Sequence, residues 1–285
     1  MFEQILLNGI FSSCTYCLVA LGLTLIMGVM DIADFAQGAL YMLSAFLTFL
    51  AAKFLGINFL FSICIAIIVA SFVGIINNIV VYQPAMKRGA SSLIAALGVL
   101  LIIQNLALLV FGPAYQSFPL SFAQEKVKIF NGIITVYKGI IILTTCVVVF
   151  AIWIFLKKSK IGKAIRAVSQ NPEGATVVGI GRGRVSNFTF GIGTALVGLT
   201  GALVSPIYAF DVFFGSEIVV KGFAISITGG LGSILGTIVS ALIIGIGENL
   251  IAGYFSTEYS NLITFVVLLL ALFFRPQGIF GRKEI

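Results

Sequence analysis

Long apolar segments recur along the whole chain and are separated by short polar stretches. A helix needs roughly 20 apolar residues to cross a bilayer, so each long segment predicts a membrane helix. The segments cover 5–29, 39–55, 57–81, 93–111, 138–156, 186–209, 218–231, 234–253 and 260–274. The pattern predicts an all-α polytopic membrane protein with about eight or nine transmembrane helices. A β-barrel would show short alternating strands instead of continuous apolar runs.

Two segments depart from this regular pattern. The segment 218–231 is short and rich in glycine, so both a full and a partial crossing fit it. The stretch 30–38 follows the first span and predicts a broken or re-entrant segment. It contains Asp31 and Asp34, and a charge inside the bilayer costs several kcal/mol unless it meets water, protein or the interface.

Two interpretations of the 30–38 stretch fit its residues. In the first, a broken helix lines a translocation path, and the predicted path residues are Asp34, Phe35, Gln37 and Gly38. In the second, the aspartates cap an interfacial helix, because Asp is a favourable N-cap residue. The first interpretation gives the stretch a role in transport, and the second gives it a structural role.

A second group of small residues lies in the sequence GGLGSILGTIVSALIIGIGEN. It supplies Gly229, Gly230, Gly232 and Gly236. Gly232, Gly236 and Ser240 are spaced four residues apart, which places small residues on one helix face and lets two helices approach closely. Tight packing or dimerisation is one interpretation, and a glycine-rich break beside a translocation path is compatible with it.

Basic residues gather in the loop 157–185, which holds seven of the 17 Lys and Arg residues and one acidic residue, Glu173. Positive charge is enriched in the cytoplasmic loops of membrane proteins, so this loop and the basic C-terminal tail are predicted to be cytoplasmic. The same rule places the loop 112–137 outside, together with the N-terminus if every segment crosses. The outer loop, with Phe118 and Pro119, is compatible with a docking site for a partner or with a plain connector.

Composition supports a membrane location and explains the charge. The chain of 285 residues is 60% hydrophobic and 9% charged, which is too little charge for the surface of a soluble domain. A net charge of +7 would suggest nucleic acid as the partner of a soluble protein. Here the basic residues set orientation instead, so we expect a lipid bilayer around the chain and no nucleic-acid partner.

The sequence lacks the residue sets that catalysis or cofactor binding needs. It has no His, the commonest metal ligand and general base. Cys14 and Cys17 form a C-x-x-C inside an apolar run, without the second pair that a zinc site requires. Gly162 and Lys163 are followed by Ala164, not by the Ser or Thr of a P-loop. We expect no catalytic, metal or cofactor site, so any ATP hydrolysis occurs on another chain.

The stretch NPEGATVVGIG, residues 171–181, interrupts the basic loop with small, weakly charged residues. Asn171 before Pro172 is a helix-start pattern, since Asn caps a helix and Pro fits its first position. Glu173 falls in the first turn, where the helix dipole favours negative charge, and Gly179 ends the helix. The pattern predicts a short cytoplasmic helix of about two turns. Its small side chains suit a docked partner, and a plain interfacial helix fits them equally.

Several segments resemble a known family. EGATVVG resembles the E-A-A-x-x-x-G motif of ABC-importer permeases, with Glu173, Ala175 and Gly179 in place and Gly174 replacing the middle Ala. The more distant Ile and Leu-Pro elements of that motif are not evident. The segments ALGLTLIMGVMDIADFAQGALYML, AVSQNPEGATVVGI, GGLGSILGT and FRPQGIFG are together similar to the permease family for branched-chain amino acids, of the high-affinity leucine, isoleucine and valine type. The similarity extends over nearly the whole chain.

The resemblance implies an ABC-importer permease fold, with one transmembrane permease domain over 1–285 in the cytoplasmic (inner) membrane and a cytoplasmic coupling loop at about 157–185. It implies four kinds of partner: a second homologous permease, two cytoplasmic ATPase subunits, an extracytoplasmic substrate-binding protein and an amino-acid substrate. In such importers the helix at 171–179 sits in a groove of an ATPase. The residues that the resemblance assigns to this coupling are Asn171, Pro172, Glu173, Ala175 and Gly179.

The sequence leaves alternatives open for the substrate and for the energy source. The family usually has Asn-Phe-Ala-His-Gly where this chain has Asp-Phe-Ala-Gln-Gly at 34–38, and permeases for urea and other amino acids belong to the same wider group. An ion-coupled secondary transporter would need paired charges inside the membrane. Asp31, Asp34 and Glu248 are its candidates, but we expect no basic partner mid-span opposite them, and Lys221 is the nearest possibility. This hypothesis also gives no reason for the 171–179 helix. A membrane enzyme would need His or clustered acids.

Overall fold

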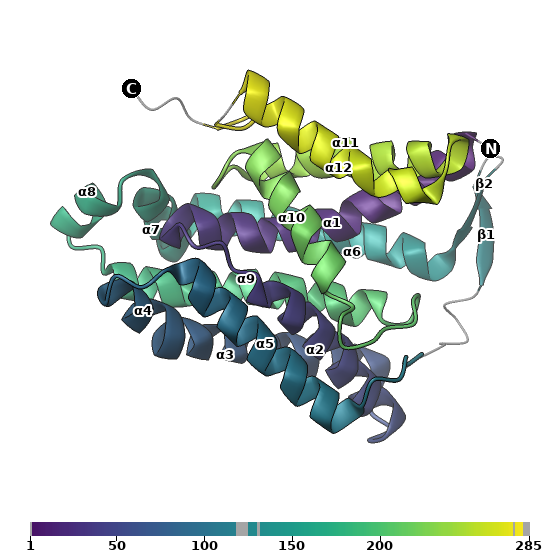
Figure 1. Cartoon of the computed structure of the whole chain (residues 1–285), viewed down its shortest axis with the longest axis horizontal. Coiled ribbons are helices and arrows are strands. Elements are labelled where there is room, and N and C mark those ends of the chain that lie inside the picture. The colour runs from purple at the N-terminus through teal and green to yellow at the C-terminus, as the bar shows by residue number, and fades with distance from the viewer. Residues whose placement is uncertain (1, 118–124, 130–131, 276, 282–285) are drawn as a thin grey trace.

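The computed structural model describes residues 2–117, 125–129, 132–275 and 277–281. They form a helical bundle with one small β-hairpin (Figure 1). In chain order the elements are α1 (Phe2–Met30), α2 (Ala36–Lys53), α3 (Phe59–Asn77), the π-helical turn η1 (Asn78–Tyr82), α4 (Gln83–Lys87), α5 (Ser92–Phe111), β1 (Lys126–Ile129), β2 (Gly132–Thr135), α6 (Val136–Lys158), α7 (Lys160–Gln170), α8 (Pro172–Val177), α9 (Arg182–Val204), α10 (Ser216–Gly229), α11 (Ile234–Tyr254) and α12 (Thr257–Phe274). The predicted all-α polytopic membrane fold is confirmed.

Seven helical segments of the described chain are long and apolar enough to cross a membrane. They are α1, the continuous run from α3 to α4, α5, α6, α9, α11 and α12. The two remaining predicted segments form α2, which has 18 residues, and α10, which has 14. With 14 residues at 1.5 Å each, α10 is about 21 Å long, less than the roughly 30 Å of a bilayer core. The segment 218–231 is therefore a short helix that does not span the membrane alone.

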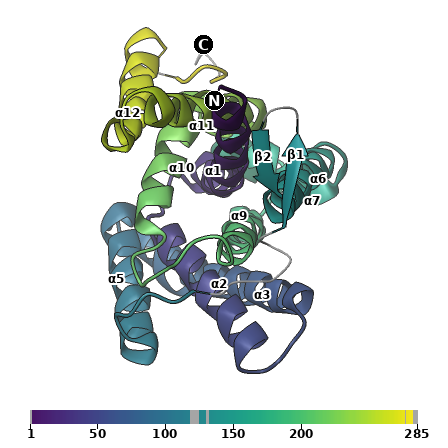
Figure 2. The ribbon, with the colours of Figure 1, turned by 90° about the vertical axis from the view of Figure 1, so that its right-hand side faces the viewer.

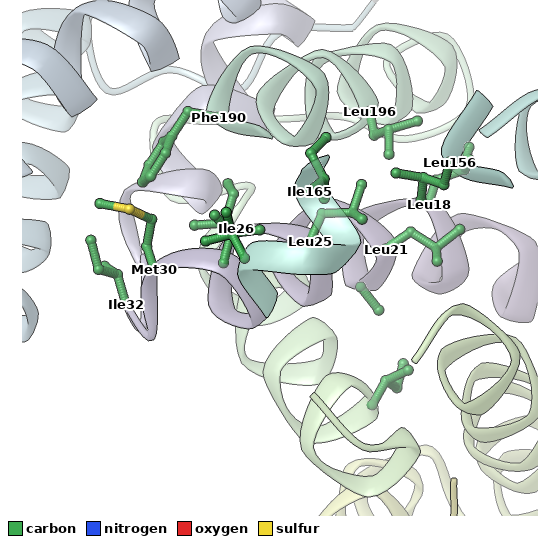
Figure 3. Close-up of a cluster of buried hydrophobic side chains, with 14 of the residues drawn as sticks. Leu18, Leu21, Leu25, Ile26, Met30, Ile32, Leu156, Ile165, Phe190 and Leu196 are labelled. Carbon is green, nitrogen blue, oxygen red and sulfur yellow. The ribbon is translucent and has the colours of Figure 1, made fainter. Parts of the chain in front are cut away.

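Helix α1 runs through the centre of the bundle, packed against α9, α10 and α11 (Figure 2). Its sequence is apolar on all sides, which is typical of a helix enclosed by others. Leu18, Leu21 and Ile26 are fully buried and meet side chains of α6, α7 and α9 (Figure 3). In contrast, α5 and α12 expose large apolar side chains such as Leu109 and Phe273, which suits contact with lipid.

The predicted break after the first span lies between α1 and α2. Asp31 has a positive φ of 57°, and α2 starts at Ala36. The start of α2 meets the start of α10, because Gly38 and Gly215 lie against each other. A Cβ on Gly215 would overlap the carbonyl oxygen of Gly38. Glycine is therefore required for this contact, which brings the starts of the two helices together inside the bundle.

The loop 112–137 contains the antiparallel hairpin of β1 and β2. Gln4 of α1 holds it, since the Gln4 amide donates to the Ile133 carbonyl at 2.9 Å and accepts from the Ile133 N–H at 2.7 Å. Phe118 and Pro119, which the sequence places in this loop, lie outside the described residues. The hairpin lies at one end of the molecule and α8 at the other (Figure 1); we call these the hairpin end and the α8 end.

The basic stretch 157–185 is more ordered than a loop, because it contains α7 as well as α8. Helix α7 was not predicted within this stretch, because its basic residues were counted and its apolar ones overlooked. Ile165 and Val168 are buried, while Lys160 and Lys163 are exposed. Apolar residues at this spacing form one face of an amphipathic helix, and that face packs α7 onto the bundle.

Candidate functional site

Three charged side chains meet between α10 and α11. The Nζ atom of Lys221 lies 2.8 Å from a carboxylate oxygen of Glu217 and 2.8 Å from one of Glu248. Tyr16 of α1 donates its hydroxyl to Glu248 at 2.7 Å, and Thr264 of α12 donates to it at 3.3 Å. Glu248 therefore accepts from donors on three helices, which fixes its carboxylate. The expectation that no basic residue lies opposite Glu248 was wrong, because Lys221, named only as the nearest possibility, pairs with it directly.

The three charges differ in burial. The exposed fraction of the side chain is 11% for Lys221, 6% for Glu248 and 67% for Glu217. Taking a charge out of water costs several kcal/mol, and a close partner of opposite charge offsets much of this cost. Lys221 and Glu248 thus form a buried neutral pair, and Glu217 adds one negative charge at its accessible edge.

This charge cluster lies deep within the bundle. Tyr16 stands at the midpoint of α1, so the cluster is far from both ends of that helix. A charged side chain in contact with lipid at this depth would cost several kcal/mol. Because the carboxylate of Glu217 is exposed, we expect the face of α10 that carries it to meet water or protein and not lipid.

A cavity of about 330 Å³ lies beside the cluster, between α1, α2, α10 and the segment 205–215. Its lining combines two opposite charges and several hydroxyl-bearing residues with apolar side chains. The lining residues are Phe11, Ser12, Thr15, Tyr16, Tyr41, Val204, Tyr208, Phe214, Glu217, Ile218 and Lys221. Sites for small molecules have this character, with apolar walls and a few convergent polar groups in roughly 300–1,000 Å³.

The predicted path residues of the 30–38 stretch lie close to this cavity without lining it. Asp34 is buried and accepts from the Tyr82 hydroxyl at 2.5 Å and from the Gln37 amide at 2.6 Å. It also accepts from the backbone N–H of residue 36, the first residue of α2, at 3.1 Å, although the N-cap position itself is held by Phe35. Phe35 stacks on Phe223 of α10 with ring centroids 4.5 Å apart. Through Tyr82 and Phe223, these side chains connect the break between α1 and α2 to η1 and to α10.

The other predicted path residues form the turn between α10 and α11 at the α8 end. A Cβ on Gly229 or on Gly236 would overlap the backbone of the other residue, so these glycines allow a close approach within the chain. Gly230 and Gly232 have φ values of 98° and 79°, which favour glycine. Gly232 also lines a second cavity of about 620 Å³, together with Arg166 of α7.

The short helix predicted at 171–179 is present as α8. The side chain of Asn171 caps it by accepting from the Gly174 N–H at 2.8 Å, and Pro172 takes its first position. Glu173 is exposed in the first turn. Gly179 follows the helix with a φ of 83°, as a left-handed C-terminal residue does. Local sequence alone therefore determines the start and the end of this helix.

Helix α8 has an inner and an outer face. Ala175 is buried in the cluster that also contains Ile165 of α7 and Leu25 of α1. Val177 and Val178 are 87% and 74% exposed, next to the exposed Glu173. The inner face thus connects α8 through α7 to the central helix. The outer face presents two valines, which the helix pattern of 171–179 did not identify as outward-facing.

Of the residues that line the cavity, sequence reasoning had named only Lys221, and the polar ones that it missed include Tyr16, Tyr208 and Glu217. Glu217 and Lys221 are four residues apart, a spacing that predicts neighbouring side chains on a helix, so the sequence contained a signal for this pair. Tyr16 and Tyr208 carry no such signal, because their approach to the charge cluster depends on how the helices pack.

Comparison with known proteins places the chain among characterised sequences. The family model for the permease component of the branched-chain amino acid transport system matches residues 5–272. The chain is 32% identical over 298 residues to the high-affinity branched-chain amino acid transport system permease protein LivH of Salmonella typhimurium, covering 100% of this chain and 97% of that protein. It is 30% identical over 300 residues to the corresponding protein BraD of Pseudomonas aeruginosa, with the same coverage.

Two further proteins extend this comparison: a permease whose name gives another substrate, and a protein of solved structure. The xylose/arabinose import permease protein XylH of Sulfolobus acidocaldarius is 30% identical over 194 residues, which cover 64% of this chain and 51% of that protein. PsaBC from Streptococcus pneumoniae, solved in complex with Fab, aligns with a TM-score of 0.52 at 12% identity over 96% of this chain and 92% of that one. At this identity, the structural likeness shows the fold alone.

Proposed function

The chain belongs to the family of permease components of branched-chain amino acid transport systems, and on this basis we propose that it forms the translocation path of an ATP-driven importer. The substrate that we propose is a branched-chain or related amino acid. The observation that carries the proposal is the cluster of Glu217, Lys221 and Glu248 beside a cavity deep in the bundle. Charged groups at this depth are expected where a polar solute crosses.

The exposed carboxylate of Glu217 supports the placement of the path. Its face of α10 does not meet lipid, so a water-filled path and the second homologous permease are the proposed neighbours of this face. The break before α2 and the short helix α10, which meet near Gly38 and Gly215, resemble the interrupted helices that line transport paths in other membrane proteins. The predicted path residues from Asp34 to Gly38 then act by holding α2 and α10 together.

Coupling to two cytoplasmic ATPases is proposed for α8. Glu173, Val177 and Val178 present an exposed surface at the α8 end, and Ala175 links α8 to the buried cluster around α1. A push on α8 therefore reaches α1 and the charge cluster through packed side chains. The ATPases would shift the permease between two states by binding them unequally.

The remaining partners follow from orientation. The basic residues of 157–185 support a cytoplasmic position for the α8 end, and the segment 277–281 near the C-terminus packs at the same end, against the turn of α10 and α11. The hairpin end then faces outward, where an extracytoplasmic binding protein would deliver the amino acid. Urea or another small solute stays the alternative substrate.

The buried pair of Lys221 and Glu248 also supplies what an ion-coupled carrier needs, so this second function requires a test. Family membership favours the ATP-driven importer, and α8 gives it a coupling surface. The carrier hypothesis predicts uptake that follows a proton or sodium gradient in the absence of ATP.

A charge reversal at α8 tests the coupling. Glu173→Arg should reduce co-purification of the ATPase subunits and uncouple ATP hydrolysis from uptake, while the permease stays folded. The matched control is Glu258→Arg, because Glu258 is also an exposed first-turn glutamate, but in α12 at the hairpin end. Equal ATPase association for both variants and the wild type would refute the proposed role of α8.

A further inference from the structure

We propose that the cavity beside Lys221 is a transient binding site for the zwitterionic head group of an α-amino acid. Lys221 takes the carboxylate of the substrate, and Glu217 takes its ammonium group. This inference rests on the proposed function and assigns the chain's own contacts with the substrate. It depends on the cavity, on two opposite charges that line it, and on the unequal burial of the ion pairs.

The charges match the chemistry of an α-amino acid. Lys221 and Glu217 are one helical turn apart on α10, and both line the cavity. An α-amino acid carries its carboxylate and its ammonium group on one carbon atom, so it fits between a neighbouring ammonium and carboxylate of the protein. The exchange replaces one ion pair with two, and the neutral zwitterion brings no net charge into the bundle.

Unequal burial decides which ion pair opens. Glu248 is buried and accepts from Lys221, Tyr16 and Thr264, so its separation from Lys221 would leave a buried charge unpaired. The pair of Lys221 and Glu217 involves a carboxylate that is largely exposed, and such pairs contribute little stability. The substrate therefore displaces Glu217 from Lys221. Glu248 is a positioning residue that holds the Lys221 ammonium at the cavity wall.

The remaining wall suits an aliphatic side chain. Phe11, Val204 and Ile218 contribute apolar surface to the cavity, and this surface favours burial of a branched hydrocarbon. The Tyr16 hydroxyl lies 3.2 Å from the Lys221 Nζ atom, so the polar groups of the cavity lie together beside Lys221. Because only one loosely held ion pair must open and close again, the substrate also leaves readily, as a transport path requires.

Cysteine protection tests the site without ATP. Ile218→Cys places a thiol on the cavity wall, in the full chain in lipid nanodiscs with the exposed Cys64 and Cys146 changed to Ser. Leucine should slow the reaction of this thiol with a small methanethiosulfonate about twofold at a concentration equal to its Kd. Isovalerate and isoamylamine, which carry one charge each, should not protect. No protection by leucine, or equal protection by all three compounds, would overturn the proposal.

Uptake by charge-neutral variants separates binding from a structural role. The double variant Lys221→Gln, Glu248→Gln removes both charges of the buried pair and leaves no buried charge unpaired, since Glu217 is largely exposed, so it should fold. We expect roughly tenfold lower amino-acid uptake for it and for Glu217→Gln, since each loses a charged contact to the substrate. Glu258→Gln, the control, should transport normally. Normal uptake by the folded double variant would overturn the inference.

The two levels of the proposal fail in different ways. If the wild type with its partners shows no ATP-dependent uptake, the importer function is wrong. If the wild type shows such uptake but leucine does not protect the thiol of the Ile218→Cys variant, the importer function stands and the zwitterion site is wrong.

Discussion

The buried pair of Lys221 and Glu248 makes a quantitative prediction about stability. Lys221→Met removes the ammonium and leaves the Glu248 carboxylate, only 6% exposed, without an opposite charge. Breaking a buried ion pair in this way costs about 3–5 kcal/mol. Removal of both charges leaves no buried charge, so Lys221→Gln combined with Glu248→Gln should recover most of that loss. Glu217→Gln removes an exposed i,i+4 partner and should cost roughly 0.3–0.5 kcal/mol.

The measurement is the free energy of unfolding of the four proteins in mixed micelles, from titration with sodium dodecyl sulfate followed by circular dichroism. The expected order of stability is wild type, Glu217→Gln, the double variant and, well below them, Lys221→Met. If Lys221→Met unfolds at the same denaturant fraction as Glu217→Gln, the pair is hydrated in the folded protein, and the large cost expected from its burial is wrong.

Three further changes test other parts of the structure. Asn171→Ala removes the cap of α8 and should destabilise the helix start by about 1 kcal/mol, seen as faster amide hydrogen exchange in α8. Gly236→Leu should force α10 and α11 apart and lower the yield of folded protein, whereas Gly98→Leu, whose Cβ would meet nothing within 4 Å, should not. Tyr82→Phe removes one of three donors to the buried Asp34 and should lower the free energy of unfolding by about 1.5–3 kcal/mol, measured by the same titration.

The sequence predicted the parts of the fold that depend on local pattern. Continuous apolar runs predicted the membrane helices, and the short run at 218–231 predicted the short α10. Asn171, Pro172 and Gly179 predicted α8, because helix caps are local chemistry. The amphipathic helix α7 was not predicted, although its pattern is also local. The many basic residues of this polar stretch drew attention away from the regular spacing of its apolar residues.

The cavity was not predictable in the same way. Glu217 and Lys221 are a local i,i+4 pair, but Tyr16 and Glu248 reach Lys221 only through the packing of α1 and α11 against α10. The contact of Gly38 with Gly215 joins segments far apart in the sequence, and no property of a single glycine reveals its partner. The sequence thus identified charged and small residues of interest, and tertiary packing decided which of them meet.

The energy source of uptake distinguishes an ATP-driven importer from an ion-coupled carrier. The chain is reconstituted into liposomes with a second permease, two ATPase subunits and a loaded binding protein, and uptake of radiolabelled leucine is followed. We expect uptake that needs ATP on the α8 side and persists when proton and sodium gradients are dissipated. Uptake that proceeds without ATP and stops when a gradient is removed would show that the chain is not the permease of an ATP-driven importer.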